Sequence, residues 1–172
     1  MAIKKCRQVM AVMALGLILS GCLTMNERWA TSSLYRIRSE TFTDISGTLT
    51  FDRMLLHRRL NPNRILLIER ATLGQEFQFA FVVDYLGPRW IFLDYLLLRI
   101  DDGDVITLGA TNTVRNVISS GVNEIVRFAL SDELVEQLLT SSSLAVQFAG
   151  DLNNIPPEGI SALQDFIRNS AD

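Results

Sequence analysis

Apolar and polar residues alternate most regularly between residues 75 and 85. Phe77, Phe79 and Phe81 lie on one side of this stretch, and polar or small residues lie on the other. This period of two predicts a half-buried β-strand. Residues 90–100 are apolar at both odd and even positions, which predicts a central strand buried on both faces. The same criteria predict further strands at residues 46–51, 65–69, 105–108, 114–118, 124–130 and 144–149.

The pattern changes from a period of two to about 3.6 after Leu130. Ser131 is a good helix N-cap, and the acids Asp132 and Glu133 suit the positive end of a helix dipole. An apolar stripe follows through residue 139. Pro156 and Pro157 favour the start of a last helix, whose apolar positions repeat at helical spacing through residue 167.

Residues 53–70 allow two interpretations. Met54, Leu55 and Leu56 fit either a short helix or an irregular strand end, and Asn61-Pro62-Asn63 is typical of a turn. The whole pattern predicts a mainly β protein of the α+β type. We expect an antiparallel β-sandwich or curved sheet with two short helices late in the chain, because such layers bury many alternating faces.

The N-terminus combines a basic head with a short apolar block. Lys4, Lys5 and Arg7 precede residues 9–19, which are apolar and end at Leu19-Ser20-Gly21-Cys22. This order is typical of a signal peptide. Eleven apolar residues are too few for a permanent span, which takes about 17–25 residues.

Small residues directly before Cys22 make this segment resemble the lipobox of bacterial lipoproteins. The resemblance implies a diacylglycerol on the Cys22 sulfur, cleavage before Cys22 and, in many bacteria, an acylated amine. It divides the chain into a signal peptide at residues 1–21, a lipid-anchored tether leading into the domain at 22–43, and one β-rich domain at 44–172. Leu23, and not an aspartate, follows Cys22. By resemblance to lipoproteins of diderm bacteria, this implies that the protein is anchored in the outer membrane and faces the periplasm.

Charge is distributed unevenly along the predicted mature chain. Residues 23–70 hold eight arginines and five acids, whereas residues 71–172 hold five arginines and fourteen acids. The acidic excess argues against a nucleic-acid partner, because phosphate binding needs a positive surface. Cys6 falls in the predicted signal peptide, so Cys22 has no partner for an intramolecular disulfide.

The residue inventory excludes several kinds of chemistry. His57 is the one histidine of the chain, and Cys22 is expected to carry lipid, so we predict no zinc site. The chain has no Gly-x-Ser-x-Gly nucleophile motif and no dinucleotide fingerprint. The acids of residues 101–104 fit a turn better than a calcium loop, which needs 6–8 oxygen ligands. We therefore predict no metal, no cofactor and no catalytic residue.

Two groups of charged residues remain as candidates. Asp94 and Glu124 lie on predicted strands, and apolar neighbours indicate that Asp94 is buried against Arg99 or Arg127 as a structural ion pair. Basic residues between 53 and 70 form the second group. They are a candidate patch for lipid phosphate, lipopolysaccharide or an acidic partner, with a solvated face or internal pairing as the alternatives: Arg53, Arg58, Arg59 and Arg64.

These features favour a non-enzymatic lipoprotein of the bacterial envelope, anchored in the membrane through Cys22. It would act as a binding, scaffolding or assembly component for an envelope protein or polysaccharide. One alternative is a lipid-anchored hydrolase of envelope glycan or lipid that uses acids such as Asp94 or Glu124. Another is a carrier of an apolar ligand, which the nine phenylalanines suggest.

Overall fold

The computed structural model describes residues 33–44, 47–60 and 63–169 of the chain. Within these ranges the strands form two antiparallel sheets, which confirms the mainly β prediction. Sheet A has the spatial order β1 (Ile37–Asp44), β2 (Gly47–Leu60), β3 (Asn63–Leu73), β4 (Glu76–Gly87), β8 (Gly121–Ala129) and β7 (Asn112–Ile118). Sheet B has the order β10 (Asp151–Ile155), β9 (Leu144–Phe148), β5 (Tyr95–Ile100) and β6 (Ile106–Gly109). The helices are α3 (Asp132–Thr140) and α4 (Pro157–Arg168).

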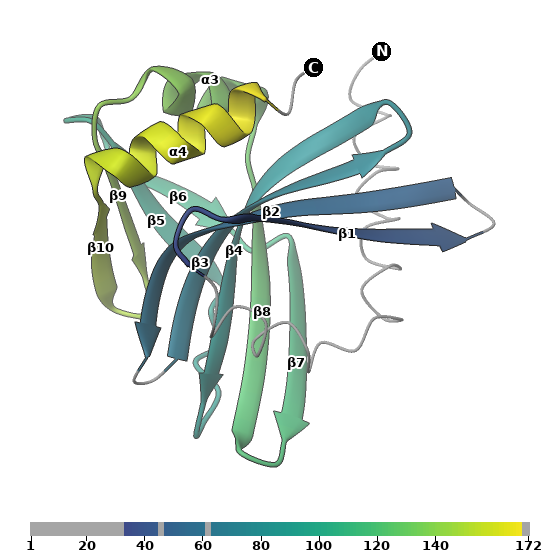
Figure 1. Ribbon diagram of the computed structural model, residues 1–172. Coiled ribbons are helices and arrows are strands. Elements are labelled where there is room, and N and C mark those ends of the chain that lie inside the picture. Colours follow the sequence, from purple (N-terminus) through teal and green to yellow (C-terminus); the bar gives the residue numbers. More distant parts are fainter. Residues whose placement is uncertain (1–32, 45–46, 61–62, 170–172) are drawn as a thin grey trace.

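The main core lies where one face of sheet A meets sheet B and the two helices. Met54, Phe81 and Phe128 of sheet A belong to one apolar cluster with Leu98 of β5 and Leu163 of α4, and none is more than 1% exposed. Figure 1 shows α3 and α4 together at one end of the molecule, with the long strands of sheet A running away from them. We call the opposite face of sheet A, turned away from sheet B and both helices, the far face.

The strand β4 is buried on both of its faces. Phe81, Val82 and Val83 are each 0% exposed, so the prediction of a half-buried strand was wrong. The reason is that each face of β4 has its own apolar cluster: Phe81 and Val83 belong to the main core, and Val82 belongs to a second cluster of sheet A residues on the far face. The two-sided strand predicted at 90–100 was also wrong. Residues 90–94 form no strand, and β5 alternates between exposed and buried positions from Tyr95 onward.

The long strand β2 settles the ambiguous segment after Arg53 in favour of a strand. The register of β2 against β3 shifts between Leu55 and His57, which marks a β-bulge that bends the strand there. Strand β1 pairs with β2 from Ile37 to Asp44, so the sheet begins within the range predicted as a tether. Cys22 and residues 61–62 of the predicted turn lie outside the described residues.

Both predicted helices are confirmed. Ser131 is the N-cap of α3, and its Oγ accepts a hydrogen bond of 3.3 Å from the backbone N–H of Leu134. Pro156 is the N-cap of α4, and Pro157 begins that helix. In the described part of the chain, no helix is long and apolar enough to cross a membrane.

The predicted turn after β5 also connects distant parts of the fold. Asp101 has a φ of 52°. Its carboxylate accepts hydrogen bonds of 2.8 Å from the backbone N–H groups of Ser142 and Ser143, and another from the Ser142 hydroxyl. These bonds to Ser142 and Ser143 lower the pKa of Asp101. The acid therefore fastens the turn to the loop that leads from α3 into β9.

Candidate functional site

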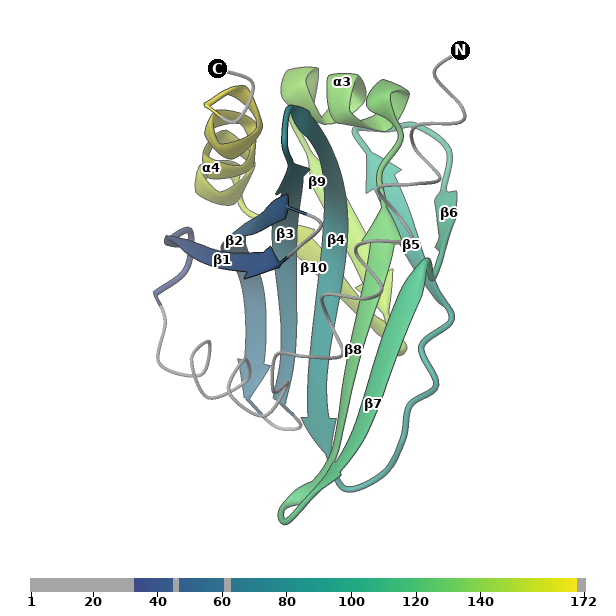
Figure 2. The same ribbon diagram turned by 90° about the vertical axis from the view of Figure 1, so that its right-hand side faces the viewer.

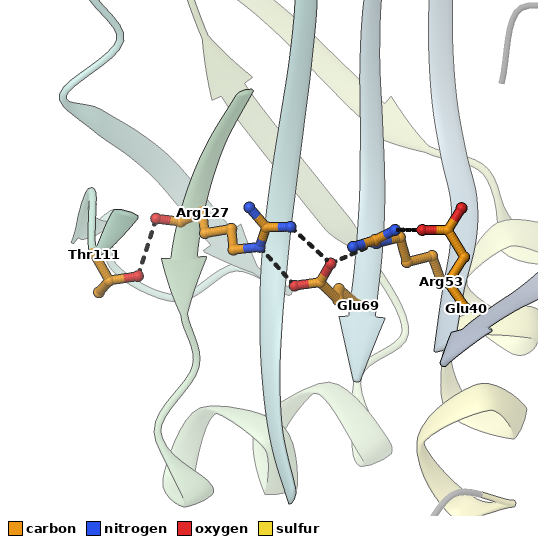
Figure 3. A network of polar contacts seen from close by, with 5 residues as sticks. All are labelled: Glu40, Arg53, Glu69, Thr111 and Arg127. Atoms are coloured by element: carbon orange, nitrogen blue, oxygen red, sulfur yellow. Dashed lines mark hydrogen bonds and ion pairs between the residues drawn. The ribbon is translucent and has the colours of Figure 1, made fainter. Parts of the chain in front are cut away.

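A chain of alternating charges lies on the far face of sheet A. Figure 3 shows Glu69 between two arginines, Arg53 of β2 and Arg127 of β8. Arg53 Nε donates to Glu69 Oε2 at 2.5 Å, and Arg127 Nε donates to Glu69 Oε1 at 2.7 Å. Arg53 Nη1 also donates to Glu40 on β1 at 2.7 Å. We call Glu40, Arg53, Glu69 and Arg127 the ionic network.

The strand register brings this network together. Arg53 lies directly opposite Glu69, and Glu69 lies opposite Ala80 of β4. Because Ala80 is small, Arg127 on the next strand reaches across β4 to Glu69. Burial opposes ionisation of Glu69, but the two neighbouring arginines outweigh burial and lower its pKa to about 2. The network is thus held ionised at neutral pH.

The same face shows how strongly sheet A curls. The guanidinium carbons of Arg53 and Arg127 lie 4.8 and 5.9 Å from the ring centroid of Phe51 on β2. Strands β2 and β8 are three places apart, which is about 14 Å in a flat sheet. Figure 2 shows the β1–β2 hairpin bent away from the plane of the long strands and lying in front of β3, which is consistent with this contact. Among the described residues, the apolar clusters beside the network consist of sheet A residues alone.

Asp84 of β4 is a second buried acid on the far face. Its Oδ1 accepts a hydrogen bond of 2.7 Å from Asn123 Nδ2. Burial raises the pKa of Asp84 to about 6, although the Asn123 bond and the charges of Arg53 and Arg127 lower it. Neither the network residues nor Asp84 line the groove beside α3 or the cavity beside residues 91–95, both described below. This arrangement suits structural ion pairing better than contact with a substrate.

The two acids proposed for a hydrolase, Asp94 and Glu124, differ in how exposed they are to solvent. Asp94 has a side chain that is 79% exposed, so the prediction that it is buried was wrong. It lies outside the strands, 3.9 Å from Arg115 Nη2. Glu124 is fully buried on β8. Its carboxylate accepts hydrogen bonds from the backbone N–H groups of residues 91–93 and from Arg115 at 3.1 Å.

Glu124 thus holds the irregular segment before β5 against sheet A. General-acid catalysis of glycoside cleavage needs a carboxyl group that carries a proton to the leaving group. The Glu124 carboxylate accepts four hydrogen bonds, one of them from arginine, and these bonds fix it in a structural role.

The structure separates the arginines of the candidate patch. Arg53 is 4% exposed and belongs to the ionic network. Arg59 and Arg64 both form ion pairs with Asp151 at the start of β10, the Arg59 pair at 2.8 Å. Internal pairing with the acidic part of the chain, one of the alternatives, therefore applies to these two. Arg58 lies on β2 opposite Ile65. Burial lowers the pKa of the neighbouring His57.

An open groove lies between the start of β4, helix α3 and the end of α4. It has a volume of about 850 Å³. We call it the α3–β4 groove. Figure 2 shows α3 lying across the end of sheet A where β4 begins. Its apolar lining residues come from these three elements and from the link before α3: Phe77, Phe79, Leu130, Val135, Leu139 and Ile167. A smaller cavity of about 200 Å³ lies beside residues 91–95.

Two features make the groove suited to binding. Phe77 is 48% exposed, so a large aromatic side chain faces solvent at its wall. The charged lining consists of three acids, Glu76, Asp132 and Glu136, against one base, Arg168. Exposed apolar area bordered by charge is typical of an interaction surface.

Sequence reasoning missed both the network and the groove. Glu69 did carry a signal, because it is an acid that directly follows the apolar run Leu66-Leu67-Ile68 within a predicted strand. The groove had none, because its β4 wall lies more than 50 residues before the helices that form the other walls, and these parts meet only through the fold.

Comparisons with known proteins give no relative. No protein-family model matches the chain, and no curated protein or solved structure matches it. Among the described residues, no group of three or more His, Cys, Asp or Glu side chains is placed to hold a metal ion.

Proposed function

We propose that this protein is a non-enzymatic lipoprotein of the bacterial envelope, anchored through lipid on Cys22, that binds a partner through the α3–β4 groove. The groove is the observation that carries the binding role, because it is open, largely apolar and bordered by acids. The anchor rests on the sequence Leu19-Ser20-Gly21-Cys22 after a basic head and a short apolar block. The outer membrane, with the domain in the periplasm, is the proposed location.

The environment of the acids supports a binding role over a hydrolytic one. Glu124 is occupied by four hydrogen bonds, and Asp94 is exposed at the surface. The arginine cluster is left out of this proposal, because Arg53, Arg59 and Arg64 are engaged with acids of the chain itself.

The anchor is tested by metabolic labelling with a fatty acid that carries a chemical tag. We expect the wild-type chain to be labelled and Cys22→Ser to be unlabelled. Cys6→Ser is the matched control, because Cys6 falls in the predicted signal peptide, and it should be labelled like the wild type. Labelling that persists in Cys22→Ser would refute the lipid anchor, and recovery in the soluble fraction would refute the membrane location.

The binding role is tested by photocrosslinking in intact cells, with a photoreactive residue at Phe77 in the groove. Val117, which is 80% exposed on β7, serves as the control position on another surface. We expect a crosslinked partner at Phe77 and none at Val117. Equal crosslinking at both positions would contradict a binding role for the groove. Tight co-purification of a lipid from the groove would support the carrier alternative instead.

A further inference from the structure

The edge of β4 is unpaired where it borders the groove. Strand β8 pairs with β4 from Ala80 to Gly87, whereas residues 76–79 pair with β3 on the other side. Leu130 continues the contact by donating its backbone N–H to the Phe79 carbonyl at 2.9 Å. After Ser131 the chain turns into α3 and leaves this edge. The edge of β4 that pairs with β8 from Ala80 onward has no strand of the described chain beside it at residues 76–78.

The groove lies directly along this edge. Five consecutive residues, Gln75 to Phe79, line one wall, and residues of both α3 and α4 line the others. Consecutive residues of a strand point to opposite faces, so a wall that includes all of them runs along the backbone edge. An unpaired edge offers N–H and C=O groups to an incoming strand, which is a known mode of peptide recognition.

The charges at the groove indicate which peptide it fits. Glu76 lies on the strand wall, and Asp132 and Glu136 are exposed on α3, opposite it. Arg168 is the single base of the lining. Anionic lipids and acidic peptides are disfavoured by three carboxylates, whereas lysine or arginine side chains are attracted by them.

We infer that the α3–β4 groove binds an extended, basic segment of a partner protein, which adds as a strand to the edge of β4 at residues 76–78. Apolar side chains of the segment pack on Phe77, Val135 and Leu139, and its alternate basic side chains face Glu76 and Glu136. This inference rests on the proposed binding role of the groove and names the class of its partner. It does not depend on the lipid anchor.

The test uses the purified full chain and synthetic eight-residue probes, with binding followed by fluorescence anisotropy and by NMR. The first probe alternates leucine and lysine, and the second alternates leucine and glutamate. We expect the basic probe to bind about tenfold more tightly than the acidic one. It should shift the amide signals of residues 76–79 and 132–139. Binding that is equal for the two probes, or absent for both, overturns the inference.

Two N-methylated forms of the basic probe distinguish strand addition from other modes. In an extended segment, alternate N–H groups face the neighbouring strand. One form carries methyl groups at odd positions and the other at even positions. We expect one form to lose binding and the other to keep it. Equal affinity of the two forms would overturn strand addition and would point to a helix or a nonspecific charge contact.

Charge reversal on the protein supplies the matched control. The double variant Glu76→Lys/Glu136→Lys should weaken binding of the basic probe about tenfold. Glu133→Lys changes an exposed acid of α3 outside the groove lining and should leave the affinity unchanged. Equal loss in both variants would overturn the role of the groove acids. Probe binding without lipid labelling of Cys22 would reject the anchor alone, whereas labelling without probe binding would reject this inference alone.

Discussion

Replacing Glu69 with glutamine is expected to destabilise the fold strongly. The carboxylate is 1% exposed and lies 2.5 Å from Arg53 Nε and 2.7 Å from Arg127 Nε. Without its charge, buried Arg127 has no ion-pair partner among the described residues, whereas Arg53 keeps Glu40. Removing one member of a buried ion pair costs about 3–5 kcal/mol.

The pKa of Glu69 gives a second, independent value for the stability that the Glu69 charge contributes. Folding lowers this pKa from 4.5 to about 2. Such a shift corresponds to about 3 kcal/mol of stability at pH 7. Because the pKa is depressed in the folded state, the contribution is complete above pH 4.5 and is lost as the pH falls from 4.5 to about 2. Both estimates agree on a loss of about 3 kcal/mol for Glu69→Gln at pH 7.

The assay is urea denaturation at pH 7 and at several pH values down to 3. Glu133→Gln, an exposed change on α3, is the matched control and should behave like the wild type. The triple variant Arg53→Met/Glu69→Leu/Arg127→Met should recover much of the loss, because it leaves no unpaired buried charge. A loss below about 1 kcal/mol in Glu69→Gln at pH 7 would refute the reasoning.

Three further changes test two buried acids and a helix cap. Folding raises the pKa of Asp84 from 3.8 to about 6, so the wild type should lose about 2 kcal/mol of stability as the pH rises from 4 to 6. Asp84→Asn should abolish this loss, as measured by urea denaturation across that range. Glu124→Ala should cost about 3 kcal/mol and speed amide hydrogen exchange at residues 91–93, because it leaves their N–H groups unbonded and removes the 3.1 Å ion pair of Arg115. Ser131→Ala should lower stability by about 1 kcal/mol through loss of the α3 cap, measured by thermal denaturation.

Each of these expectations has a result that contradicts it. For Asp84→Asn, the contradictory result is a stability that still falls between pH 4 and 6. For Glu124→Ala it is unchanged hydrogen exchange at residues 91–93. For Ser131→Ala it is a loss no larger than that of Ser142→Ala, whose hydroxyl bonds an exposed turn instead of a helix end.

The sequence alone determined the features that neighbouring residues encode. Alternation with a period of two predicted many of the strands. Ser131 and Pro157 predicted the starts of the two helices, because a cap or a first-turn proline acts within one helical turn. The N-terminal segment carries its own signal in the same local way, and it supplied the lipoprotein hypothesis.

The tertiary structure alone decided which strand is central, which acids are buried and where the surface is hollow. Residues 90–100 are more apolar in pattern than residues 76–87, yet β4 is the doubly buried strand, because one of its faces packs in the main core and the other in a second cluster of sheet A residues. Asp94 is exposed although its neighbours are apolar, whereas Glu69 is buried because Arg53 and Arg127 converge on it from strands 16 and 58 residues away. Such contacts depend on sheet order and register, which no local pattern encodes.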